Sequence, residues 1–144
     1  MKPFHILVCG GRDFANPDVK PREEALKEYR FLCRKLNELA SKHSAFYVPE
    51  DNWLPSDIVI ISGHAVGADR AAEDWAVVNW AHWIEFPADW KKYGKSAGYI
   101  RNKQMLVEGR PDLVVAFPGG RGTANMVKLA KEAGVPVIEY TYPE

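Results

Sequence analysis

Short apolar runs and helix-period segments alternate along this chain. Apolar runs of strand length occur at residues 4–9, 57–61, 83–86, 112–117 and 137–140. Between them, apolar side chains recur every three or four positions, as in amphipathic helices, at residues 21–42, 67–80, 95–108 and 124–133. Strand–helix alternation of this kind predicts an α/β fold, with a mostly parallel sheet of about five strands and helices on both faces.

Two segments carry no such periodicity. Residues 44–55 contain prolines and an asparagine, and we predict an irregular connection there, with a short extra strand around residues 46–48 or a lid over a ligand as alternatives. Residues 89–94 are expected to form a loop in which Trp90 and Tyr93 stand among lysines. These rings either stack on a nucleobase or pack against neighbouring side chains.

Composition and charge narrow the class of protein. A chain of 144 residues fits one domain, residues 1–144. Its 47% apolar and 26% charged content is that of a globular protein. The 19 basic and 19 acidic side chains cancel, which argues against a general nucleic-acid or membrane surface and leaves room for a local basic pocket.

We expect a cytoplasmic protein, because no targeting signal is recognised and the cysteine spacing is not that of a metal site. The N-terminus lacks a signal peptide, and no apolar run approaches the length of about 18 residues that spans a membrane. Cys9 and Cys33 show no metal-binding spacing, and we expect both to be free thiols in a reducing compartment.

The most informative stretch is residues 118–123, with the sequence Pro-Gly-Gly-Arg-Gly-Thr, between the apolar run 112–117 and a helix. A strand that breaks into glycines and restarts as a helix directs free backbone N–H groups and the helix dipole at one point, where phosphate is the usual ligand. Glycine lets an anion approach the backbone closely. The spacing differs from both the dinucleotide fingerprint and the Walker loop. A tight strand–helix turn without a ligand is the alternative.

Two other strand ends carry similar loops. Gly10, Gly11, Arg12 and Asp13 follow the first strand, and small residues at 62–69 follow the second. Because ligands of open α/β sheets bind beyond the carboxyl ends of the strands, these loops and the glycine loop are expected to converge on one pocket. For Arg12 and Asp13, a surface ion pair with each other is the alternative.

Three side chains near these loops are candidates for chemistry. Asp69 either complements the dipole of the helix whose first turn it occupies or serves as a catalytic or ribose-binding carboxylate. His64 either polarises a ligand or caps its turn. Arg101 lies among apolar residues on a helix, which suits a phosphate clamp, with a snorkelling surface arginine as the alternative.

Taken in order, these motifs resemble a known family. They are Gly-Gly-Arg-Asp-Phe at 10–14, Ser-Gly-His-Ala-Val-Gly-Ala-Asp at 62–69, Trp90 with Tyr93-Gly94, Ala97-Gly98, Arg101-Asn102, Met105 and the loop at 118–123. Over nearly its whole length the chain resembles the YspA/YpsA-related branch of the SLOG superfamily, small proteins common in phages and bacteria. The resemblance implies a Rossmann-like three-layer sandwich and a nucleotide or nucleotide-derived ligand.

The superfamily also includes the LOG phosphoribohydrolases and the Rossmann domain of the DNA-processing protein DprA. The LOG motif is a PGGxGT loop followed by glutamates, with an arginine upstream that Arg101 matches. Asn125 and Met126 occupy the glutamate positions here, and neither can act as a carboxylate. A substitute carboxylate would come from Asp69, Asp13 or Glu73, and we favour Asp69.

Two functions follow as expectations. The first is binding or sensing of a nucleoside monophosphate, NAD or ADP-ribose type of ligand. The alternative is a nucleotide N-glycosidase or phosphoribohydrolase, with Asp69 and Arg101 as the catalytic residues. The expected ligand-binding residues are Gly10, Gly11, Arg12, Asp13, Gly63, His64, Gly67, Ala68, Asn102, Pro118, Gly119, Gly120, Arg121, Gly122 and Thr123.

The expected partners are few. We expect a small-molecule nucleotide ligand, no metal, no cofactor and no membrane. A DNA-binding role by analogy with DprA lacks a basic stripe to support it. A homo-oligomer is left open, since superfamily members often pair and the 5 tryptophans are suited to an aromatic interface.

Overall fold

The computed structural model describes residues 2–48 and 54–144. The strands are β1 (Phe4–Cys9), β2 (Ile58–Ser62), β3 (His82–Glu85), β4 (Leu113–Ala116) and β5 (Val137–Glu139). The helices are α1 (Arg22–His43), α2 (Ala68–Asn79), α3 (Trp90–Tyr93), α4 (Ala97–Gly109) and α5 (Arg121–Glu132), with a 3₁₀ turn η1 (Gly94–Ser96) between α3 and α4.

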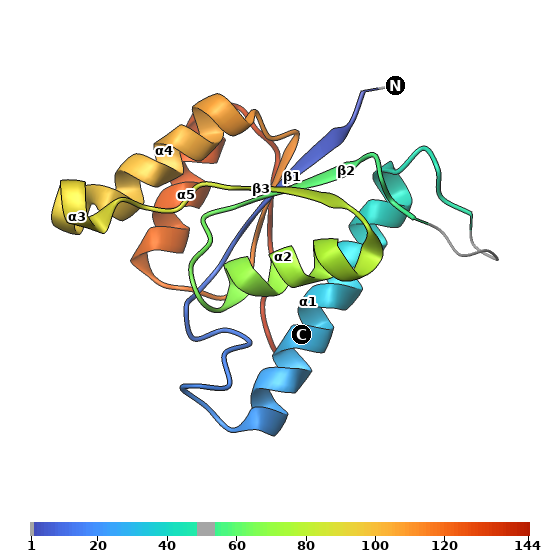
Figure 1. The fold of residues 1–144 in the computed structure, drawn as a ribbon, viewed down its shortest axis with the longest axis horizontal. Coiled ribbons are helices and arrows are strands. Elements are labelled where there is room, and N and C mark those ends of the chain that lie inside the picture. Colours follow the sequence, from blue (N-terminus) through green and yellow to red (C-terminus); the bar gives the residue numbers. More distant parts are fainter. Residues whose placement is uncertain (1, 49–53) are drawn as a thin grey trace.

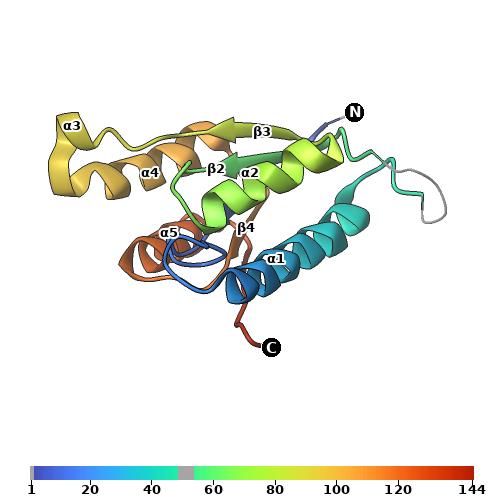
Figure 2. The same cartoon turned by 60° about the horizontal axis from the view of Figure 1, so that its bottom comes forward.

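The five strands form one parallel sheet in the order β3-β2-β1-β4-β5. Helices α1 and α2 cover one face, and α4 and α5 cover the other (Figure 1). Figure 2 shows α1 and α2 running alongside each other on their face. This is the Rossmann-like three-layer sandwich that the sequence predicts.

Side chains of β1 alternate between the two layers of the core. Ile6 and Val8 pack in the cluster that includes Phe31 of α1 and Trp75 of α2. Leu7 and its neighbours along the sheet pack instead against α4 and α5. Because the strand is buried on both faces, it is a continuous apolar run in the sequence rather than an alternating one.

Helix α1 is the longest helix of the described chain, with 22 residues. Glu23 and Glu24 lie in its first turn, and Lys42 and His43 lie in its last, which complements the helix dipole at both ends. Its buried stripe faces the sheet, and the rest of its surface is mostly polar, with Leu26 as an exposed apolar residue. Within the described ranges, no helix combines the length and the apolar character needed to cross a membrane.

The strand order opens a crevice beside β1. From β1 the chain continues to β2 and β3 on one side, whereas β4 and β5 lie on the other. The loops that leave β1 and β4 therefore turn toward opposite faces of the sheet, and this switch point is where ligands of open α/β sheets bind. The two loops are joined by one hydrogen bond, from the Gly11 N–H to the Pro118 carbonyl at 2.8 Å.

Two local expectations are wrong, and the first is only the alternative of an extra strand, because residues 44–48 and 54–55 form the irregular connection that the sequence predicts. Residues 46–48 form a turn and an irregular segment rather than a strand. The Asp57 carboxylate accepts hydrogen bonds from the Ser44 hydroxyl and the Ala45 N–H, each at 2.7 Å, and this holds the segment in a turn. Of the lid proposed at 44–55, residues 49–53 lie outside the described residues.

The second wrong prediction is the loop at 89–94, where the structure has α3 and the start of η1. Asp89 caps α3, because its carboxylate accepts the Lys92 N–H at 3.0 Å. Helix α5 also begins earlier than the periodicity indicates, at Arg121, so the last three residues of the glycine loop are its first turn.

Candidate functional site

A cleft of about 680 Å³ lies at the carboxyl ends of β1 and β4. Most of the predicted site residues line it, namely Gly10, Gly11, Arg12, Asp13, Asp69, Arg101, Asn102, Pro118, Gly119, Gly120, Gly122 and Thr123. Others lie outside its lining, namely Gly63, His64, Gly67, Ala68 and Arg121. The structure thus brings together the loops after β1 and β4, the start of α2 and the inner face of α4.

Helix α5 opens onto this cleft through its N-terminus. Its N-cap is Gly120, and no side chain caps the first turn. An added Cβ on Gly120 or Gly122 would meet nothing within 4 Å, so both residues border open space. The first-turn N–H groups are therefore available to a ligand, as an anion-binding helix terminus requires.

Gly119 has a different role from its neighbours. A Cβ on Gly119 would strike the Thr123 hydroxyl and would come within 2.7 Å of the Gly11 nitrogen. Glycine is needed here so that the β4 loop can pack against the β1 loop, whereas the sequence suggested that it leaves room for an anion. Gly120 and Gly122 are the glycines whose missing side chains leave space in the cleft.

The start of α2 packs against the loop after β1 and is hydrogen-bonded to it. The Ala68 N–H donates to the Gly11 carbonyl at 3.1 Å, and a Cβ on Gly10 would come within 2.5 Å of the Ala68 Cβ. Gly67 has a φ of 90° and packs on the carbonyls of Gly11 and Arg12. Gly67 and Ala68 are outside the cleft because they are covered by the loop that they hold.

Arg101 extends from α4 to the edge of β2 and is half-buried. Its Nη1 donates to the Gly63 carbonyl at 2.6 Å and, more weakly, to the Phe86 carbonyl at 3.5 Å. Its Nε donates to the Asn102 Oδ1 at 3.1 Å. Burial lowers the pKa of Arg101, and the nearby Asp69 charge opposes that shift. A surface snorkelling role is excluded, because the guanidinium lines the cleft and hydrogen-bonds to its wall.

Asp69 is a buried carboxylate, 7% exposed, in the first turn of α2. Burial raises its pKa from 3.8 to about 6, against the lowering effect of the Ala65 N–H, which donates to Oδ2 at 3.3 Å, and of the charges of Arg101 and Arg12. A carboxylate that titrates this close to neutrality in a cleft can exchange a proton with a ligand.

The rim of the cleft carries an aromatic contact. The Arg12 guanidinium lies over the Trp90 ring, 5.1 Å from its centre. In the described chain Arg12 makes no ion pair with Asp13, so the alternative of a mutual surface pair does not hold. Of the two aromatic residues singled out in the 89–94 segment, Trp90 lines the cleft and Tyr93 does not.

Sequence reasoning missed one polar pair in the lining. Lys20 lies 2.8 Å from the buried Glu28 carboxylate, which also accepts the Ala15 N–H at 2.8 Å. Both side chains line the cleft, as does Tyr142 from the C-terminal segment. No motif joins these positions, and only the path of the chain after β1 brings Lys20 to Glu28.

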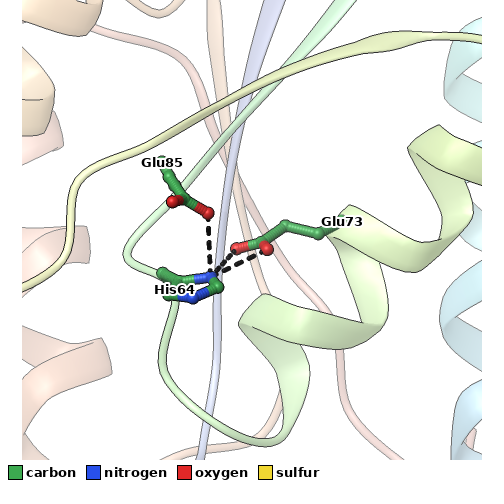
Figure 3. A group of neighbouring side chains, drawn as sticks. All are labelled: His64, Glu73 and Glu85. Carbon is green, nitrogen blue, oxygen red and sulfur yellow. Dashed lines mark hydrogen bonds and ion pairs between the residues drawn. The ribbon is translucent and has the colours of Figure 1, made fainter.

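His64 does not line the cleft. Its Nδ1 faces the carboxylates of Glu73 on α2 and Glu85 on β3 (Figure 3). The Ser62 hydroxyl accepts the His64 N–H at 3.0 Å and donates to Glu73 at 2.5 Å. The ring of His64 is therefore engaged by Glu73 and Glu85, and this three-residue cluster was not anticipated from the sequence.

The fold and the cleft together define a Rossmann-like protein with an uncapped helix terminus at its switch point. The chain belongs to the family described as YspA, cpYpsA-related SLOG family, whose model matches residues 4–93, more than half of its length. It is also 38% identical over 96 residues to the Gene 61 protein of Mycobacterium phage D29, across 60% of this chain and 74% of that protein.

The family match does not reach the whole cleft. It covers β1 to α3, and therefore the loop that carries Arg12 and the first turn of α2, which carries Asp69. Helix α4 with Arg101 and the loop at 118–123 lie beyond residue 93. The resemblance along the remainder of the chain is carried by the motifs themselves.

Proposed function

We propose that this protein binds a nucleotide or nucleotide-derived ligand, of the nucleoside monophosphate, NAD or ADP-ribose type, in the cleft between β1 and β4. Membership of the SLOG family supports a nucleotide-related ligand. The observation that carries the proposal is that the uncapped N-terminus of α5 borders the same cleft as the guanidinium groups of Arg12 and Arg101. An anion in the cleft would meet both the helix dipole and two cations.

The phosphate of the ligand occupies the start of α5. The N–H groups of Gly119, Gly120, Gly122 and Thr123 supply its hydrogen bonds, and Gly120 and Gly122 leave it room. Arg101 is held by Gly63 and Asn102 through Nη1 and Nε, and in the described chain Nη2 makes no hydrogen bond. The Nη2 edge of the guanidinium is therefore left to donate hydrogen bonds to a phosphate oxygen.

The sugar and base occupy the other end of the cleft. The carboxylate of Asp69 or Asp13 accepts hydrogen bonds from ribose hydroxyls. The Trp90 ring, which Arg12 now covers, is the aromatic surface on which a base stacks. Arg12 would then turn from the ring to the phosphate.

A second function, hydrolysis of the N-glycosidic bond, is favoured by the raised pKa of Asp69. A carboxylate with a pKa of about 6 can accept a proton from water while the water oxygen bonds to the anomeric carbon; the base departs with the electron pair of the glycosidic bond and takes up a proton from solvent. Asp69 would replace the glutamates of the LOG motif, whose positions hold Asn125 and Met126. Arg101 would orient the substrate through its phosphate.

One experiment separates the two functions. Purified protein is incubated with a panel of nucleoside monophosphates, NAD and ADP-ribose, and both thermal shift and free base are measured. A shift without base release supports binding alone. Base release that is abolished in Asp69→Asn, with the shift retained, supports the hydrolase, and Glu132→Gln, an exposed carboxylate outside the cleft, is the control for loss of a negative charge. Absence of any shift across the panel would contradict both functions.

A further inference from the structure

One cluster beside the cleft is not used by the proposed function. It joins His64 from the loop after β2, Glu73 of α2 and Glu85 at the end of β3 (Figure 3). The Nδ1 atom of His64 lies 2.9 Å and 3.1 Å from the carboxylate oxygens of Glu73 and 3.0 Å from Oε2 of Glu85. One ring nitrogen therefore faces two carboxylates, and it carries at most one proton to share between them.

The charges of this cluster do not balance. Two carboxylates bring two negative charges, and an imidazole supplies at most one positive charge. In the part of the chain that the structure describes, no lysine or arginine is ion-paired with Glu73 or Glu85. The Ser62 hydroxyl fixes one oxygen of Glu73 at 2.5 Å but adds no charge. The cluster thus has an excess of acceptor atoms and of negative charge.

We propose that His64, Glu73 and Glu85 bind a divalent transition-metal ion, with zinc as the best fit. This departs from the sequence analysis, which expected no metal. The donor atoms all lie within 4.8 Å of one another and come from three separate elements. Imidazole nitrogen and carboxylate oxygen are donors that zinc accepts, whereas magnesium and calcium prefer oxygen alone.

The geometry of the cluster is close to that of a zinc site. Zinc bonds of about 2.0–2.2 Å place tetrahedral ligands about 3.3–3.6 Å apart. The present separations of 2.9 Å and 3.0 Å between Nδ1 and the nearest carboxylate oxygens reach that range with shifts of the side chains. The side chains of His64 and Glu85 are 34% and 45% exposed, so a fourth position is open to water.

The metal proposal can be tested separately from the nucleotide proposal. None of its three ligands lines the cleft, although Gly63, whose carbonyl holds Arg101, is the neighbour of His64 in the chain. Loss of nucleotide binding in Arg101→Ala should therefore leave metal binding intact.

The test is equilibrium dialysis of the untagged full chain against zinc chloride, and separately manganese chloride, after removal of bound metal with a chelator. We expect one equivalent of zinc to bind and the melting temperature to rise with it. Glu85→Gln, at an exposed position, should weaken zinc binding at least about tenfold, and His64→Ala should do the same. His82→Ala, an exposed histidine on the same strand, is the matched control and should bind zinc like the wild type.

Three results would overturn the proposal. The first is the absence of saturable zinc binding to the wild-type protein, which would make the cluster an ion-pair group only. The second is zinc binding that survives unchanged in both Glu85→Gln and His64→Ala. The third is loss of binding in the His82→Ala control, which would assign the zinc to another surface histidine.

Discussion

The Arg101 guanidinium fills the space that a side chain on Gly63 would need. A Cβ built on Gly63 would lie 2.6 Å from the Arg101 Cζ, while Nη1 donates to the Gly63 carbonyl at 2.6 Å. The end of β2 and the middle of α4 are therefore fitted to each other through one glycine and one arginine. Gly63 does not line the cleft, yet it determines where the Arg101 charge lies in it.

Gly63→Ala should consequently reproduce much of the effect of Arg101→Ala on ligand binding. Removal of a charged hydrogen bond to phosphate should weaken nucleotide binding by about 1.5–3 kcal/mol. The methyl group added in Gly63→Ala would displace the guanidinium and lose the same contact. Isothermal titration of the two single variants and the double variant checks this. We expect the double variant to be no weaker than Arg101→Ala alone, because both changes remove one interaction, and additive losses would contradict the coupling.

The buried Asp69 carboxyl should make folding stability depend on pH. Its pKa is raised from 3.8 to about 6, so between these values the folded chain binds more protons than the unfolded chain. The stability that this proton uptake provides is present at low pH and is lost as pH rises through about 6. Asp69→Asn removes the dependence. Relative to wild type, the variant should gain about 2 kcal/mol in free energy of unfolding between about pH 4.5 and about pH 7.5.

Urea denaturation at the two pH values measures this difference. Asp13→Asn is the comparison variant, because Asp13 is an exposed carboxylate of the same cleft and its removal controls for the change in net charge. Equal differences between wild type and Asp69→Asn at both pH values would show that Asp69 titrates as an ordinary surface carboxylate.

Asn102 should be important for stability as well as for the site. Its amide nitrogen donates to the Gly122 carbonyl at 3.1 Å and to the Asn125 side chain at 3.0 Å, and its oxygen accepts from Arg101. Asn102 is buried, so Asn102→Ala removes these three hydrogen bonds together and should lower the free energy of unfolding by about 1–3 kcal/mol. Asn125→Ala removes only one of the contacts and should be milder. Equal, small losses in the two variants would contradict a linking role for Asn102 between α4 and α5.

Much of the fold could be predicted from the sequence because burial on both faces makes parallel strands continuous apolar runs. Residues 4–9 coincide with β1 for this reason, and β5 ends within one residue of the predicted run. Local side-chain contacts were not visible in the pattern. The Asp57 carboxylate holds residues 44–46 in a turn through hydrogen bonds. Asp89 caps the N-terminus of α3, in a segment that has no apolar periodicity.

The parts of the site that lie in loops at strand ends could be predicted from the sequence. The parts that depend on the pairing register between strands could not. Loops at strand ends converge in any parallel sheet, which brought Arg12, Asp69 and the 118–123 loop to one cleft. The cluster at His64 arises because Ser62 and Glu85 are partners in the register between β2 and β3. No spacing in the sequence encodes that register, so Glu85 gave no signal of its proximity to His64.

The most direct test of the account compares each nucleoside monophosphate with the nucleoside that lacks its phosphate, by isothermal titration to the same wild-type protein. If the start of α5, Arg12 and Arg101 hold a phosphate, at least one monophosphate binds and its nucleoside binds at least about tenfold more weakly. Equal affinity for a monophosphate and its nucleoside would contradict the central claim, because it would show that the glycine loop and the two arginines do not contact the ligand's charge.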